Sequence, residues 1–158
     1  MTVAAKLQDE IRQKAPFTSV EQEAYLNLLR TAEALSQQVE KLLRASGLSG
    51  TQYNVLRILR GAGPGGLTCG ETGERMVTHD PDITRLLDRL EKRKLITRAR
   101  DARDRRVVTA RITRQGLRLL EELNEPLAGL QRKLFGRMSK QDLKKLSLLL
   151  ESARESEV

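Results

Sequence analysis

Apolar residues recur at steps of three and four along most of the chain, the spacing that places them on one face of an α-helix. The longest such pattern begins after Ser19 and continues to Gly47. It predicts one amphipathic helix of about 26 residues, roughly 40 Å long. Such a stripe is more often part of a chain's own core, but a helix this long in a small chain favours burial against a second subunit. Its apolar positions are Tyr25, Leu28, Leu29, Ala32, Leu35, Val39, Leu42 and Leu43.

Capping residues predict where the other helices begin. Residues 3–14 form a weakly helical segment that ends before Pro16, and a glycine-rich loop occupies residues 61–66. Pro126 is expected to interrupt and kink a later helix, because proline removes a backbone hydrogen bond. The expected starts are Ser49 with Gln52, Thr68 for a short helix through Met76, Asp80 with Pro81 in the first turn, Thr113, and Ser139 with Asp142.

The pattern changes to β character after Lys94. Residues 95–98 and 107–112 flank the charged segment 101–106, which predicts a two-stranded hairpin with a basic tip. The helix before it carries Ile83, Leu86, Leu87 and Leu90 on one face, typical of packing against a core. We therefore expect a mainly α protein with a small β-hairpin. It would comprise a winged helix-turn-helix domain at 48–113 and long dimerisation helices at 1–47 and 114–158, all in one compact unit.

Composition supports a helical globular domain and excludes several kinds of site. Of the 158 residues, 39% are hydrophobic, 32% charged and 3% aromatic. The one cysteine, Cys69, excludes an internal disulfide, and together with the one histidine, His79, it cannot complete a four-ligand zinc site. We therefore expect no metal and no cofactor. The sequence has neither a secretory leader nor an apolar run of about 20 residues, so we expect a cytoplasmic protein without a membrane partner.

The positive charge is concentrated in one part of the chain. The formal net charge is +8, and residues 85–118 contain 13 Lys or Arg against four Asp or Glu, so this segment carries +9 and the remainder −1. A charge run is often only a solvated face. Here the cations cluster on one predicted helix and one predicted hairpin, which favours a polyanionic partner, because each neutralised phosphate releases a condensed counterion.

A winged helix-turn-helix binds duplex DNA with its second helix in the major groove and its hairpin along the duplex. Thr84 and Arg85 lie near the amino-terminal end of that helix on its polar face, and an arginine can donate to guanine O6 and N7 together. Thr68, Thr78 and His79 are candidates for backbone phosphate contacts, although His79 equally well only closes the turn. The expected major-groove residues are Asp80, Pro81, Asp82, Thr84, Arg85 and Arg89.

Four segments together resemble the MarR family of bacterial regulators: TCGE at 68–71, DPDITRLLDRLEKR at 80–93, DARDRR at 101–106 and ITRQG at 112–116. The resemblance implies that Asp104 orients the guanidinium of Arg106 for the minor groove, with Arg103 and Arg105 as phosphate or minor-groove neighbours. Arginine favours the negative potential of a narrow minor groove, which agrees with this role. The alternative is that Asp104 and Arg106 only brace the hairpin.

The resemblance also implies a two-fold dimer whose first, fifth and sixth helices interlock, which here would use the stripe of residues 20–45 and the apolar faces of 117–153. Two copies would place the recognition helices one DNA turn apart, about 34–36 Å, and predict an inverted-repeat operator. A small lipophilic or phenolic effector is expected between the dimerisation helices and the DNA-binding lobe. In one departure, many relatives have glycine where this chain has Lys94, and a left-handed helix end at lysine costs roughly 1 kcal/mol.

Other functions fit the sequence less well. An enzyme would need a nucleophile beside a base, a metal cluster or a phosphate-binding loop, and none is recognisable. An RNA-binding protein usually displays aromatic stacking platforms, and the basic segment has no aromatic residue. A winged-helix adaptor that binds other proteins without specific DNA binding stays open. Cys69 is interpreted as a small packing residue, with a redox role as the alternative.

Overall fold

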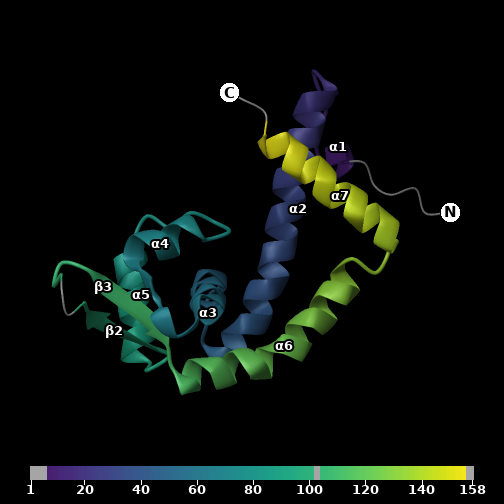
Figure 1. Ribbon diagram of the computed structural model, residues 1–158. Helices are drawn as coiled ribbons and strands as arrows, with labels where there is room; N and C mark the ends of the chain where they lie inside the picture. Colours follow the sequence, from purple (N-terminus) through teal and green to yellow (C-terminus); the bar gives the residue numbers. More distant parts are fainter. Residues whose placement is uncertain (1–6, 102–103, 156–158) are drawn as a thin grey trace.

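The computed structural model describes residues 7–101 and 104–155. Helices α3 (Gly50–Ala62), α4 (Cys69–Glu74) and α5 (Ile83–Lys92) form one lobe with a small sheet. Helices α2 (Val20–Leu43) and α6 (Arg114–Leu134) extend away from this lobe, and α7 (Lys140–Arg154) follows α6 at its far end (Figure 1). A short helix, α1 (Leu7–Glu10), precedes α2. The mainly α, winged helix-turn-helix fold expected from the sequence is confirmed.

The sheet has three antiparallel strands in the order β1-β3-β2. Strands β2 (Ile96–Arg100) and β3 (Val108–Ile112) form the predicted hairpin, with Ile96 opposite Ile112 and Arg100 opposite Val108. Strand β1 (Leu67–Thr68) pairs with the other edge of β3, and the sequence analysis did not predict it. Two residues are too few to show the alternation by which a strand is recognised.

One hydrophobic core joins the lobe to the near ends of α2 and α6. Leu56 and Leu59 of α3, Leu90 of α5 and Leu120 of α6 are completely buried. The core therefore fixes the lobe on these two helices, while their outer halves lie outside it. The buried residues of the cluster are Leu43, Leu48, Val55, Leu56, Leu59, Leu67, Leu86, Leu87, Leu90, Leu95, Ile96, Ala110, Leu120, Leu123 and Leu127.

Most of the predicted helix starts are confirmed by their capping bonds. Ser49 and Gln52 form a reciprocal capping box, as do Ser139 and Asp142, and the side chain of Thr113 accepts the N–H of Gly116. Thr68 caps α4 in the same way with Glu71, although α4 ends at Glu74 and not at Met76. The first helix ends at Glu10 and not at residue 14, and residues 3–6 of the expected helix lie outside the described residues.

The expected interruption at Pro126 is wrong, because α6 continues through this residue as one helix. Leu123 and Leu127 on either side of the proline are buried in the core, and their packing holds both turns in place despite the lost hydrogen bond. The axis of α6 bends along its length in Figure 1.

In the described parts of the chain, 7–101 and 104–155, no helix has the length and apolar character to cross a membrane.

Helix α5 ends in a left-handed turn at Lys94, whose φ angle is 58°. The N–H of Lys94 donates to the carbonyl of Glu91 at 2.8 Å, and the N–H of Leu95 donates to that of Leu90 at 3.1 Å. These two bonds form a Schellman motif, in which glycine is the usual left-handed residue. The left-handed turn is thus formed with lysine, at a conformational cost.

Replacing Lys94 by glycine is expected to stabilise the fold. The cost of the left-handed conformation, about 1–2 kcal/mol, disappears with glycine. The greater entropy of glycine in the unfolded chain offsets part of this benefit, so the free energy of unfolding should rise by about 0.5–1 kcal/mol. Urea unfolding of Lys94→Gly and wild type measures the difference. Lys94→Ala is the control, since it removes the charge and keeps the Cβ, and an equal gain in that variant would contradict the explanation.

Candidate nucleic-acid interface

The turn before the recognition helix α5 is held by two aspartates. The Asp82 carboxylate accepts the N–H of Arg85 at 3.0 Å and is the N-cap of α5, while the Asp80 carboxylate accepts the N–H of Asp82 at 2.9 Å. The prediction that Asp80 caps the helix with Pro81 in its first turn is therefore wrong. Asp80 is engaged in a local turn that keeps Pro81 and Asp82 outside the helix, and this places Thr84 and Arg85 in the first turn of α5.

The two faces of α5 differ sharply in burial. Leu86, Leu87 and Leu90 are buried in the core, whereas Thr84, Arg85 and Arg89 are exposed on the opposite face. Neither Arg85 nor Arg89 forms an ion pair with any residue in the described ranges. Arg85 in the first turn of α5 and Arg89 further along it therefore present two guanidinium groups to solvent, and no ion pair within the described residues occupies them.

The connection from α4 to α5 is fastened to the helix behind it. The Asn54 side-chain oxygen, on α3, accepts the N–H of Val77 at 3.0 Å. Val77, Thr78 and His79 are exposed in this connection. The structure thus places Thr78 and His79 directly before the turn that leads into α5, on a segment that Asn54 keeps close to α3.

The wing is the hairpin of β2 and β3 with the segment that connects them. The Asp104 carboxylate accepts the backbone N–H of Arg106 at 2.9 Å, the N–H of Asp104 donates to the Asp101 carboxylate at 3.1 Å, and the N–H of Val107 donates to the Asp104 carbonyl at 3.0 Å. No ion pair joins Asp104 to the Arg106 guanidinium in the described part of the chain. Asp104 therefore shapes the backbone of the turn, and the guanidinium of Arg106 is not held by it.

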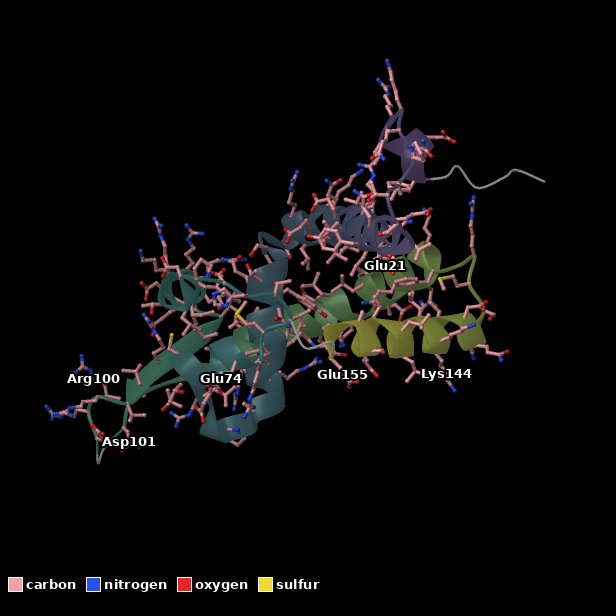
Figure 2. All side chains as sticks on the ribbon, turned by 90° about the horizontal axis from the view of Figure 1, so that it is seen from above. Glu21, Glu74, Arg100, Asp101, Lys144 and Glu155 are labelled. Atoms are coloured by element: carbon pink, nitrogen blue, oxygen red, sulfur yellow. The ribbon has the colours of Figure 1, made fainter. Side chains whose placement is uncertain are left out.

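The wing projects away from the rest of the lobe, as the positions of Arg100 and Asp101 in Figure 2 show. Arg105 and Arg106 are exposed beside its tip. Arg103, which the sequence analysis also placed here, lies outside the described residues. The described wing cations are thus presented on a protruding hairpin, on a different element from the cations of α5.

A cleft of about 450 Å³ lies between α4, the start of α5 and the wing. Thr68, Cys69, Thr84 and Arg106 contribute to its walls, together with the apolar Leu87. Cys69 is partly buried, and its Sγ lies 3.7 Å from the Oγ1 of Thr84. Thr68, Thr84 and Arg106, far apart in the sequence, therefore line one groove, and Cys69 makes a packing contact across it.

Two carboxylates on α5 are paired with an arginine of the wing, a contact that the sequence analysis missed. Arg98 of β2 lies with its Nη2 2.5 Å from Asp88 Oδ1 and 2.7 Å from Glu91 Oε2. These bonds lower the pKa of Glu91 below its ordinary value, chiefly through the hydrogen bond from Arg98, and they raise the pKa of Arg98. The i, i+3 spacing of Asp88 and Glu91 was a signal that they share one side of the helix.

Comparison with known proteins identifies the relatives of this lobe. A model described as the MarR family matches residues 46–107. A MarR transcription factor from Planctomyces limnophilus is 39% identical, with 86% of this chain and 98% of that chain covered and a TM-score of 0.68. The HTH-type transcriptional regulator FarR of Neisseria gonorrhoeae is 30% identical over 100 residues, 63% of this chain and 67% of FarR. The chain belongs to the MarR family.

A more distant structure shows the same fold. BpsR of Bordetella bronchiseptica, described with the regulation of its DNA binding by 6-hydroxynicotinic acid, is 23% identical, with 90% of this chain and all of BpsR covered and a TM-score of 0.77. Family members are transcriptional regulators and not enzymes. The MarR protein described here is therefore a DNA-binding transcription regulator. The expectation that it is not an enzyme is confirmed, and the adaptor alternative is set aside.

Proposed function

We propose that this MarR protein is a bacterial repressor that acts in the cytoplasm as a homodimer, binds an inverted-repeat operator and is released from it by a small molecule. The observation that carries the DNA-binding part is the pair of cationic surfaces described above. Thr84, Arg85 and Arg89 face solvent on α5, and Arg105 and Arg106 face solvent on the wing. The surface on α5 suits the major groove, and the surface on the wing suits the adjacent minor groove.

The assignment of individual contacts follows from this arrangement. Arg85, in the first turn of α5, is assigned to guanine in the major groove, with Asp80, Pro81, Asp82, Thr84 and Arg89 around it. Arg106 is assigned to the minor groove, with Arg103, Asp104 and Arg105 at the same turn. Thr68, Thr78 and His79 flank these surfaces and are assigned to the phosphate backbone, where hydroxyl and imidazole groups commonly bind.

Selection of bound duplexes from a random pool tests this proposal. We expect a roughly palindromic site, and a loss of about 1–3 kcal/mol in binding for Arg106→Ala or for Arg85→Ala. Arg106→Ala should weaken base preference at the edges of each half-site. Arg85→Ala should weaken base preference at the inner positions of the half-site. Arg137→Ala, at the exposed α6–α7 corner, removes the same charge far from the lobe and serves as control. A pool without enrichment, or equal losses in all three variants, would refute the assignment.

Dimerisation is supported by apolar residues that the single chain leaves uncovered. No residue of α7 is buried, and Leu43 is the one buried residue of α2 in its 24-residue length. Tyr25 of α2 is 60% exposed, and Leu148 and Leu149 of α7 are 66% and 60% exposed. Exposed large apolar residues on α2, which extends from the lobe, and on α7, at the far end of α6, are typical of an obligate interface. We infer that 1–47 and 114–158 supply the dimerisation helices.

Sedimentation equilibrium tests the dimer. Wild type is expected at twice the 17.8 kDa mass of the chain at micromolar concentration. Leu149→Lys should shift it toward monomer, because a lysine at an apolar contact leaves a charge to be desolvated. Gln141→Lys adds the same charge at an exposed polar position of α7 and should remain dimeric. A wild type that is monomeric throughout this range would overturn the proposal.

A second cleft supports a small-molecule effector. It has a volume of about 370 Å³ and lies where α2, α3 and α6 meet the connection before α5, with Leu35, Val39, Asn54, Val77 and Phe135 among its lining residues. Its walls are largely apolar, which suits a small lipophilic or phenolic compound. A ligand that separates Asn54 from Val77 would move the segment leading into α5, and so weaken operator binding.

Titration with 6-hydroxynicotinic acid and simple phenols tests this effector site. A compound that binds is expected to raise the melting temperature and to lower operator affinity at least about tenfold, a typical coupling between two sites. Leu35→Trp, which fills the cleft, should abolish both effects, while Gln141→Trp, at an exposed polar position of α7, should not. If no compound changes either quantity, release by such ligands is refuted.

A further inference from the structure

One arginine, Arg98, joins the wing to the recognition helix through both its backbone N–H and its guanidinium group. Besides its two contacts through Nη2, Arg98 donates from Nε to Glu91 Oε2 at 3.1 Å, and its backbone N–H donates to Glu91 Oε1 at 3.0 Å. Both oxygens of Glu91 and one of Asp88 are thus bound by a single residue. The Arg98 side chain is only 24% exposed, so these bonds are less screened than those of a surface pair.

The place of Arg98 in the sheet explains why the contact matters. Strand β2 is an edge strand, since β3 lies between it and β1. The N–H that Arg98 directs away from β3 would have no partner in the sheet, and Glu91 supplies one. Arg98 therefore uses its backbone and its guanidinium together to hold the outer edge of the hairpin against α5.

The wing extends well past this point. Arg100 is the last residue of β2 and pairs with Val108, and the turn follows. At about 3.3 Å per residue, Asp101 at the start of the turn lies roughly 10 Å beyond Arg98. A rotation of the hairpin by a few degrees at its base therefore displaces Asp101 by a distance that a groove contact does not tolerate, because such contacts need placement within about 0.5 Å.

We propose that Arg98 is a positioning residue for DNA recognition: by clamping β2 to Asp88 and Glu91, it sets the angle between the recognition helix and the wing so that both grooves are read at once. This inference rests on the proposed minor-groove contact of Arg106. It assigns no DNA contact to Arg98 itself, because its guanidinium is already occupied by the two carboxylates of α5. The pairing also offsets one of these two negative charges beside the DNA-binding face.

Two variants of opposite charge separate positioning from simple electrostatics. Arg98→Met removes one positive charge, and Glu91→Gln removes one negative charge, so an electrostatic role would shift DNA affinity in opposite directions. If Arg98 acts by positioning the wing, both variants should lose base preference at the edges of the half-site. Both should keep the base preference that α5 reads. For the selected operator we expect roughly tenfold weaker binding by Arg98→Met. Lys144→Met is the charge-matched control, remote from the lobe (Figure 2).

A double-mutant cycle between Arg98→Met and Arg106→Ala completes the test, with melting temperature and sedimentation measured for every variant. If Arg98 acts through the wing, the double variant binds no more than about twofold more weakly than Arg106→Ala alone, because the contact that Arg98 positions is already lost. Additive losses, or opposite shifts for Arg98→Met and Glu91→Gln, overturn the inference and leave the Arg106 contact standing. No effect of Arg106→Ala alone refutes the proposed wing contact itself.

Discussion

The DNA-binding lobe depends on the backbone of one buried residue, Leu95, where three elements meet. Its N–H closes the end of α5 on the carbonyl of Leu90, and its carbonyl accepts both the N–H and the hydroxyl of Thr113, the N-cap of α6. Its side chain is 2% exposed in the core. Gly116 packs so closely that a Cβ there would lie 2.4 Å from the Leu95 carbonyl oxygen. The close approach of the Leu95 carbonyl leaves no room for a side chain at residue 116, which explains the glycine three residues after the N-cap Thr113.

The long helices are connected to the lobe by polar contacts around the same junction. Glu40 of α2 accepts the N–H of Gly50 at the start of α3 at 2.6 Å. Arg93, at the end of α5, donates to the carbonyls of Ser46 and Gly47 beyond the end of α2. The end of α2 is therefore bonded both to the helix behind the recognition helix and to the recognition helix itself. A change in the position of α2 within a dimer would reach α5 through these bonds, with Asn54 and Val77 as a second connection.

The features predicted well from sequence were those with a local cause. Ser49, Thr113 and Ser139 cap their helices because a side-chain oxygen two or three residues from a free N–H needs no distant partner. The same rule was ambiguous at Asp80 and Asp82, two aspartates that each offer a cap. In the structure Asp82 is the N-cap, and Asp80 accepts the N–H of Asp82 in the turn before the helix. The interruption expected at Pro126 was wrong for a related reason, since Leu123 and Leu127 pack in the core on both sides of it, and the helix bends without ending.

By itself, the sequence determined the order of the helices, the hairpin, the concentration of positive charge and the resemblance to MarR regulators, because periodicity, capping and charge are read from neighbouring residues. Only the tertiary structure decided that a two-residue strand completes the sheet, that Asp104 binds a backbone N–H in the wing, and that Arg98 joins the wing to Asp88 and Glu91. Each of these depends on which backbone groups and side chains are left without a partner once the chain has folded. That is a property of contacts between distant residues, which no local pattern contains.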